Sequence, residues 1–388
     1  MKKFQQSPTD PDFIQSPYEF YDRARLAGDL FYWEDYELPC AVSYRAVTAI
    51  LKDRRLGREA PPEKAPAIPD HLRPFYAVEN HSMLELEPPR HTRLRSLVTR
   101  AFTSRRIAAL EPMIHDLCHD LIDRFPDGPF DLLDYYARPV PVIVICKLLG
   151  VPSHHADQLL AWSNDMVAIY QARRTKQIEL AAAKAAQEFA DFIRGFIDDK
   201  RKTPSDDLIS ELIRAEEEGE KLSTDELVTT IILLLNAGHE ATVHTLGNGV
   251  YTLIQNGKPE ITPASVEEII RFDPPLHMFT RWVYEDVELF GHHFQRGDQI
   301  GCLLAAANRD PETYPMPSAF LPDRVGPTNT SFGAGIHFCV GAPLARLEIR
   351  IALGALTIRY PELRLHELPK YADVYHFHGL EKLAVLKS

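Results

Sequence analysis

A short glycine-rich segment near the C-terminus contains a cysteine, and its backbone can fold closely around the thiol. Residues 331–341 read Ser-Phe-Gly-Ala-Gly-Ile-His-Phe-Cys-Val-Gly, and the cysteine is Cys339. The three glycines permit backbone conformations that larger side chains forbid, so the loop can wrap around a sulfur atom and a flat cofactor. Apolar residues at helical spacing follow from Leu344 to Ala355, which places Cys339 at a helix N-terminus. The helix dipole there favours the thiolate, the form of cysteine that binds metals.

Two simpler interpretations compete with a metal-binding thiolate. The first is an inert buried thiol, the interpretation that we adopt for the other four cysteines, Cys40, Cys118, Cys146 and Cys302. The second is structural zinc, which takes four ligands, commonly in paired spacings; His337-x-Cys339 has no partner pair. Five widely spaced cysteines in a long chain do not indicate a disulfide framework.

The segment resembles the haem-ligand loop of the cytochrome P450 family, Phe-x-x-Gly-x-His-x-Cys-x-Gly. The five fixed positions are present as Phe332, Gly335, His337, Cys339 and Gly341. The resemblance implies haem b (iron protoporphyrin IX) with an axial thiolate from Cys339. It also implies the family's fold, a single triangular domain over residues 1–388 that is mainly α with a small β region and has a long central helix over the haem.

The resemblance extends to residues that would surround the haem. A lone His or Arg is more often a surface residue, but four of them match the positions that bind the haem propionates in the family, and buried carboxylates need such partners. These four are His91, Arg95, Arg281 and His337. The remaining cofactor-binding positions implied are Phe332, Gly333, Ala237 and Gly238.

Residues 237–242, Ala-Gly-His-Glu-Ala-Thr, interrupt the most apolar helical run. Small residues there suggest that something flat approaches the backbone, and a buried Glu240 needs a partner or a function. In the family an acid and an alcohol at this place relay protons, so Glu240 and Thr242 join Cys339 as catalytic candidates. Ala241, however, occupies the alcohol position, and Thr242 is about 100° further around the helix. We hypothesise that an ordered water or a substrate hydroxyl completes the relay.

Flanking patterns predict the elements that position these residues. Ser223 and Glu226 form a capping-box pattern that begins a helix reaching about Gln255. Thr262-Pro263 begins a second helix that ends at Asp273. Other helices are expected near 91–101, 107–124, 139–149, 154–170, 176–200, 205–217 and from Cys339 to Tyr360, and strands near 30–33, 41–42, 280–283 and 287–289.

Residues 59–81, rich in proline, are expected to form a long loop.

The resemblance also implies a buried ionic network. In the family the residues that match Glu268, Arg271 and Arg324 form this network, which positions the cysteine loop.

Charge and hydropathy limit the partners. The formal net charge is −12, which argues against nucleic acid. No signal peptide or apolar run long enough for a membrane anchor is present, so a cytoplasmic protein is expected. Residues 88–110 nevertheless hold six arginines and no acid. We interpret this basic patch as a docking site for an acidic redox partner, a ferredoxin served by a ferredoxin reductase.

The resemblance implies a monooxygenase that inserts one oxygen atom of O2 into a C–H bond of a small hydrophobic substrate. A peroxide-driven peroxygenase and a non-catalytic haem-binding protein are the alternatives. The positions implied for the pocket wall are Leu233, Asn236, Ala237, Leu276, His277 and Phe377.

Overall fold

The computed structural model describes residues 1–171, 173–217, 222–375 and 377–387. They form two compact units, each built from separate stretches of chain. Unit 1 comprises residues 1–65, 115–137 and 241–388, and unit 2 comprises residues 66–114 and 138–240. The expected single domain over residues 1–388 stays a prediction. The expected class, mainly α with a small β region, is confirmed.

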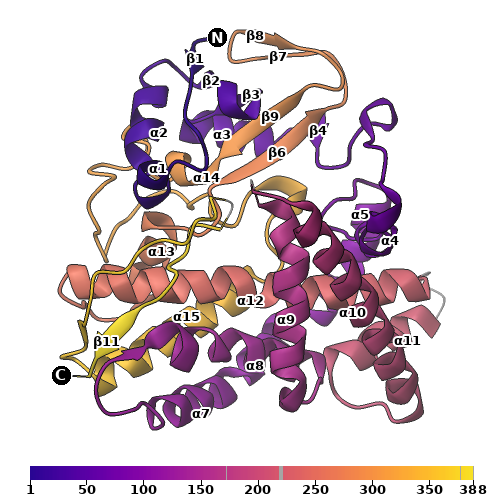
Figure 1. Cartoon of the computed structure of the whole chain (residues 1–388), viewed down its shortest axis with the longest axis vertical. Helices are drawn as coiled ribbons and strands as arrows, with labels where there is room; N and C mark the ends of the chain where they lie inside the picture. The colour runs from indigo at the N-terminus through magenta and orange to yellow at the C-terminus, as the bar shows by residue number, and fades with distance from the viewer. Residues whose placement is uncertain (172, 218–221, 376, 388) are drawn as a thin grey trace. The chain divides into compact units, whose positions relative to one another are not determined.

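Unit 1 contains the sheets (Figure 1). The largest has the order β1-β2-β3-β9-β6-β4, in which β3 pairs with β9 in parallel and β6 with β9 antiparallel. A smaller sheet has the order β10-β11-β5, and β7 and β8 form a hairpin. The strands are β1 Lys3–Phe4, β2 Leu30–Trp33, β3 Leu38–Ala41, β4 Leu56–Gly57, β5 Phe130–Asp131, β6 Met278–Val283, β7 Val287–Leu289, β8 His292–Phe294, β9 Gln299–Leu303, β10 Arg364–Leu365 and β11 Ala384–Leu386.

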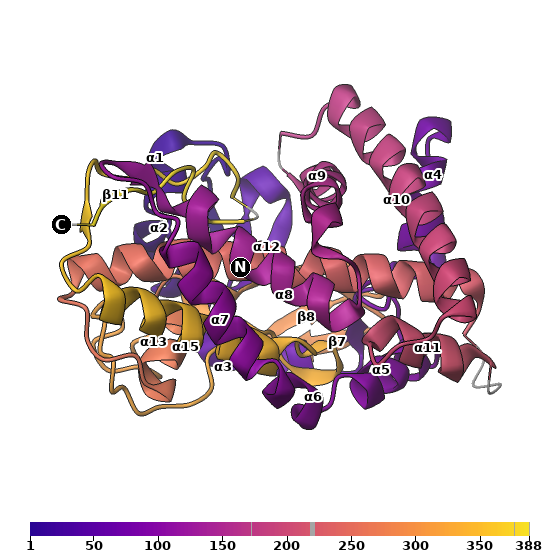
Figure 2. The ribbon, with the colours of Figure 1, turned by 90° about the horizontal axis from the view of Figure 1, so that it is seen from below.

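Three helices of unit 1 contact strands of the largest sheet: α2 contacts β2, α3 contacts β4 and β9, and α14 contacts β6. α13 and α15 contact each other and run side by side in Figure 2. The helices are α1 Pro11–Gln15, α2 Tyr18–Arg25, α3 Tyr44–Lys52, α13 Pro263–Phe272, α14 Leu304–Ala307, α15 Ala342–Arg359 and most of α7 Glu111–Ile122.

Unit 2 is helical. Its longest helix, α10, contacts both α9 and α4. The helices are α4 Arg73–Glu79, α5 Arg90–Ala101, α6 Ser104–Ala109, α8 Pro139–Leu149, α9 Ala156–Val167, α10 Lys176–Lys202 and α11 Leu208–Glu217. No helix among the described residues is both long and apolar enough to cross a membrane.

The longest helix of the chain is α12, Thr224–Gln255, and its predicted start is confirmed. The Ser223 amide donates to Glu226 Oε2 at 2.9 Å, and the Glu226 amide donates to Ser223 Oγ at 3.2 Å. The two bonds complete a capping box. α13 also begins at Thr262-Pro263 as predicted, with Asp273 as its C-cap.

Two expectations about the first third of the chain were wrong. Residues 59–81 include α4, and its Pro74 lies in the first helical turn, where proline removes no intrahelical hydrogen bond. The helix expected over 107–124 is two helices that meet at Leu110, because Pro112 begins a new first turn.

Candidate functional site

The cysteine loop lies in unit 1, directly before α15. The Cys339 amide donates to the carbonyl of Phe332 at 3.0 Å, which closes the loop into a compact turn. All five cysteines lie in described parts of the chain, and Cys339 alone is exposed. Burial raises the pKa of the Cys118 and Cys146 thiols to about 11 and that of Cys302 to about 12, so these side chains stay neutral. The chain therefore presents one accessible thiol, at the positive end of a helix.

Glycine at position 335 is required by the way that the loop packs. Gly335 has φ +71°, and a Cβ there would lie 2.4 Å from the carbonyl oxygen of Leu51 in α3. The Arg346 guanidinium lies 4.6 Å from the Phe332 ring centroid and pairs with Glu267. Gly333 also has a positive φ, +70°.

A buried ionic network links α13 to this loop. The Glu268 carboxylate pairs with Arg271 at 2.7 Å and with Arg324 at 3.0 Å, as the sequence predicted. Arg271 also donates to the carbonyl of Asn308 at 2.8 Å, and the Asn308 side chain donates to Ser331 Oγ at 2.8 Å. A continuous chain of hydrogen bonds thus runs from the network to the first residue of the cysteine loop.

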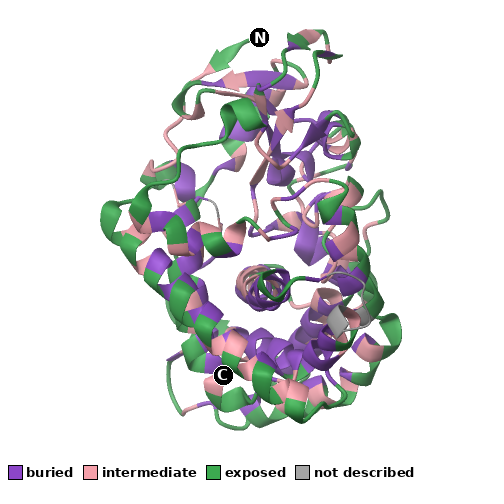
Figure 3. Cartoon of the chain, turned by 90° about the vertical axis from the view of Figure 1, so that its right-hand side faces the viewer, coloured by how far each residue is buried: buried purple, intermediate pink, exposed green. Residues whose placement is uncertain are grey.

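Helix α12 has one face that protein atoms leave partly uncovered. Between Glu226 and Val250 every residue is buried except seven, and Ala237 is the most accessible of them. At about 100° per residue these seven fall on one side of the helix, centred near Ala237. Figure 3, which views this helix end-on, shows buried and partly buried residues around its circumference. We call this side the open face: Leu233, Asn236, Ala237, Gly238, Glu240, Ala241 and His244.

The two small residues at 237 and 238 differ in what they face. A Cβ on Gly238 would lie 2.9 Å from Ile145 Cγ1, so this glycine lets α8 approach α12. Ala237, by contrast, is exposed. The sequence argument assigned both small residues to the cofactor, whereas the contact of Gly238 is explained by helix packing.

The acid and the alcohol candidates lie on different sides of α12. Glu240 is on the open face, and its Oε2 is 3.6 Å from Nε2 of the buried His239. Thr242 is 6% exposed and is turned about 180° from Leu233, away from the open face. Thr242 is therefore poorly placed to act with Glu240.

The four residues expected at the haem propionates divide between the units. His91 and Arg95 are one turn apart on α5 in unit 2, and His91 is 2% exposed. In unit 1, Arg281 on β6 is also 2% exposed, and His337 ends the short 3₁₀ turn before Cys339. A buried guanidinium and a buried imidazole suit an anionic ligand.

The residues expected in the pocket wall are only partly in suitable places. Leu233, Asn236 and Ala237 are on the open face, and Leu276 pairs with Phe377 in a β-bridge. His277 differs, since it is 0% exposed and its Nδ1 is 2.8 Å from the Tyr21 hydroxyl. A side chain with no accessible surface does not line a pocket, so we leave His277 out of it.

Part of the basic patch is neutralised inside unit 2. Arg93 pairs with Glu226, and Arg106 pairs with Glu211 and Asp206. Sequence reasoning missed these pairs because the partners are about 100 residues away. It missed the Arg346–Glu267 ion pair for the same reason.

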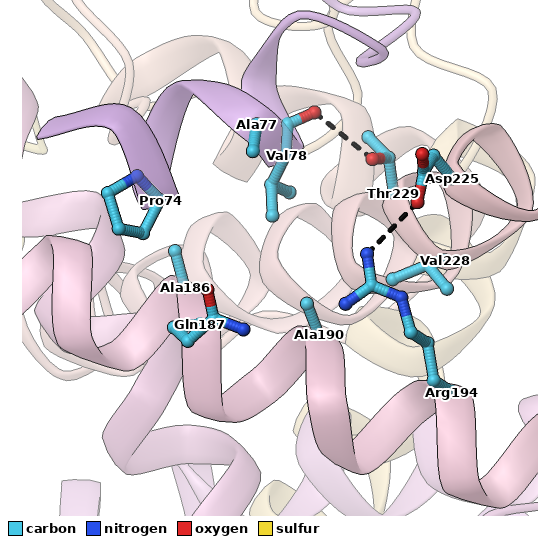
Figure 4. A pocket seen from close by; sticks show the side chains of 10 residues that line it. All are labelled: Pro74, Ala77, Val78, Ala186, Gln187, Ala190, Arg194, Asp225, Val228 and Thr229. Carbon is cyan, nitrogen blue, oxygen red and sulfur yellow. Dashed lines mark hydrogen bonds and ion pairs between the residues drawn. The ribbon is translucent and has the colours of Figure 1, made fainter.

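A separate cavity in unit 2 is too small for an organic substrate. Its volume is about 30 Å³, and Figure 4 shows its walls, from α4, α10 and the start of α12. Arg194 pairs with Asp225 at 3.0 Å, and the Thr229 hydroxyl donates to the carbonyl of Val78 at 3.0 Å. The space is sufficient for a water molecule.

Comparison with known proteins agrees with the fold and the loop. The family model described as Cytochrome P450 matches residues 61–262 and 257–368. The polyketide biosynthesis cytochrome P450 PksS of Bacillus subtilis is 36% identical over 412 residues, which cover 100% of both chains. The 6-deoxyerythronolide B hydroxylase of Saccharopolyspora erythraea is 36% identical over 91% of this chain and 90% of its own. The crystal structure of P450BioI in complex with hexadec-9Z-enoic acid ligated acyl carrier protein superposes with a TM-score of 0.91. It is 31% identical and covers 97% of this chain and 99% of its own.

The chain belongs to the cytochrome P450 family. It is accordingly an oxidoreductase of the monooxygenase class, and its cofactor is haem b held by a cysteine thiolate. The described residues fit that cofactor, because the single exposed thiol, the open face of α12 and the buried Arg281 guanidinium are features that a thiolate-ligated haem requires.

Proposed function

We propose that the protein inserts one oxygen atom of O2 into a C–H bond of a small hydrophobic substrate, with electrons from a ferredoxin and its reductase. The reaction balances as O2, R–H, two electrons and two protons giving R–OH and water. The observation that carries the proposal is Cys339, the one exposed thiol, in a glycine-rich turn at the start of α15. Haem b supplies oxygen activation when it is bound, and thiolate ligation favours cleavage of the O–O bond.

The residues of the chain take separate roles in this proposal. Cys339 would hold the haem iron through its thiolate. His91, Arg95, Arg281 and His337 would hold the propionates by charge-assisted hydrogen bonds. Phe332 and Gly333 would contact the cofactor from the cysteine loop, and Ala237 would contact it from α12. Glu240, on the open face of α12, would supply protons for the reaction.

The proposed substrate class rests on the residues expected in the pocket wall and on what the relatives are named for. The open face offers apolar surface at Leu233 and Ala237, with one amide at Asn236 whose Nδ2 is 3.7 Å from Met166 Sδ. Relatives are named for polyketide biosynthesis and for hydroxylation of 6-deoxyerythronolide B, and one structure holds a fatty acyl chain on its carrier protein. A polyketide-like or acyl substrate fits this mixture of apolar surface and a single amide.

Electron delivery is assigned to the exposed part of the basic patch. Arg100 and Arg105 are exposed. Arg93 and Arg106 are less exposed and pair with acidic residues. Reversing the charge of Arg105, as Arg105→Glu, should slow reduction by ferredoxin at low salt and leave reduction by dithionite unchanged. An equal rate with ferredoxin would contradict the docking site.

The absorption spectrum of the reduced, carbon monoxide-treated protein tests the core of the proposal. We expect a strongly red-shifted Soret band in the wild type and in Cys146→Ala, which removes a buried thiol. Cys339→Ser should lose the shift. A red-shifted band that survives in Cys339→Ser would remove Cys339 from its role.

A further inference from the structure

Three buried side chains of unit 1 that have no role in the oxygen chemistry converge. Asp273 ends α13, His277 precedes β6, and His378 comes from the C-terminal segment. They are 5%, 0% and 2% exposed, and each contributes a potential ligand atom within 4.8 Å of the other two. Two imidazoles and a carboxylate are the ligands that borderline divalent metals prefer.

Surrounding tyrosines fix two of the three side chains. The Tyr21 hydroxyl lies 2.8 Å from His277 Nδ1, which leaves Nε2 as the other ring nitrogen. The Tyr18 hydroxyl donates to one Asp273 oxygen at 3.0 Å, and Tyr371 donates to the other at 2.6 Å. Metal-binding histidines and carboxylates are commonly oriented by hydrogen bonds of this kind.

Two observations point to a cation site. His277 Nε2 is buried and makes no hydrogen bond of good geometry, although the imidazole also has a backbone contact at Pro274. A poorly satisfied ring nitrogen costs free energy in a protein interior. His378 Nε2 lies 3.6 Å from Asp273 Oδ1, which is too long for a hydrogen bond. Ligands bound at about 2.0–2.1 Å to a tetrahedral zinc are about 3.3 Å apart, so the gap is close to the spacing of two ligands on one ion.

The charges near the cluster bear on which ion it takes. The Arg309 guanidinium, stacked on Tyr18 at 3.4 Å, opposes a cation. A hard ion held by charge alone is therefore disfavoured relative to one that bonds to nitrogen.

We propose that Asp273, His277 and His378 bind one borderline divalent transition metal, with Zn²⁺ as the first candidate. The ion fastens the C-terminal segment to the start of β6. The residues next to the two histidines, Leu276 and Phe377, already pair in a β-bridge, so the ion also stabilises a segment that we assign to the substrate pocket.

The test is the metal content of the haem-loaded protein, made with added ZnCl2 and purified without a metal-affinity step. Elemental analysis should give about one zinc per haem iron after dialysis against a chelator, because the buried site exchanges slowly. His277→Gln and His378→Gln should each reduce the ratio at least tenfold. His71→Gln, which removes a partly buried histidine of unit 2 that pairs with Glu179, should keep it.

If a variant does not fold, measurements on the wild-type protein alone test the proposed metal site. Zinc-edge X-ray absorption should then show nitrogen and oxygen ligands at about 2.0–2.1 Å that include two imidazoles. Zinc below about a tenth of the haem iron in the wild type, sulfur ligation, or equal zinc in all four proteins would overturn the proposal. None of these results depends on turnover, so they leave the proposed monooxygenase reaction to its own test.

Discussion

Replacing Glu268 by Gln tests whether the buried network determines the stability of unit 1. The Glu268 carboxylate is 2% exposed and accepts hydrogen bonds from Arg271, from Arg324 and from the Leu321 amide. The substitution leaves two guanidiniums buried without their anion. Breaking a buried pair in this way costs about 3–5 kcal/mol. Each arginine retains backbone carbonyl acceptors. We therefore expect the free energy of unfolding to decrease by an amount within that range and not beyond it.

The next residue provides a matched control. The Glu267 side chain is 40% exposed, and its partner Arg346 is 30% exposed, so Glu267→Gln should cost about 0–1 kcal/mol. Urea unfolding of the haem-loaded variants, followed by tryptophan fluorescence and by the Soret band, measures both losses. Equal losses for the two variants would refute the assignment of a structural role to the network.

A second readout separates the network's effect on the cysteine loop from its effect on stability. The hydrogen bonds from Arg271 through Asn308 reach Ser331. Glu268→Gln should therefore produce a fraction of protein whose reduced, carbon monoxide-bound Soret band is not red-shifted, even well below the unfolding midpoint. Glu267→Gln also removes the partner of Arg346, which stacks on Phe332, but leaves this chain of bonds intact.

Three further substitutions have definite expected outcomes. Gly238→Ala places a Cβ 2.9 Å from Ile145 Cγ1, so it should cost about 1–3 kcal/mol in urea unfolding. It should cost less when it is added to Ile145→Ala, which removes Cγ1, and an equal cost in the two backgrounds would argue against this packing. Ala241→Thr should raise the fraction of electrons that appear in product, measured as product per NADH; a coupling that is already tight and does not change would remove Ala241 as the missing alcohol position. Burial raises the pKa of Asp207, but hydrogen bonds led by that from Lys200 outweigh it and hold the pKa below 3.8. The charge of Asp207 thus stabilises the fold above about pH 4, and this stabilisation is lost as the pH falls further. The free energy of unfolding of Asp207→Asn should therefore decrease less steeply with falling pH in that acid range than that of the wild type.

The sequence predicted elements well where the signal was local. The Ser223–Glu226 box and Thr262-Pro263 mark helix starts within a few residues, and both helices begin there. The cysteine loop was recognisable for the same reason, since its fixed positions span ten residues. Prolines were misread when they stood in a first helical turn, as Pro74 does in α4, because the same residue also ends helices.

The contacts that hold the site residues in place were harder to predict from the sequence. Nothing local pairs Glu267 with Arg346 or Gly238 with Ile145, because these contacts depend on how distant helices pack. A small residue has the same appearance in a sequence whether it leaves room for a cofactor or for another helix. The difference between Ala237 and Gly238 therefore required three-dimensional coordinates.

The open face of α12 narrows the choices for the proton relay. Thr242 is buried on the far side, and the Thr245 hydroxyl donates to the carbonyl of Ala241 at 2.7 Å. Neither threonine next to Ala241 thus offers a hydroxyl beside Glu240. A hydroxyl that replaces the alcohol has to come from a group other than these two threonines, and an ordered water or a hydroxyl of the substrate can supply it. The second source makes coupling a property of each substrate, so a pair of substrates that differ only in that hydroxyl should differ in coupling in the wild type and much less in Ala241→Thr.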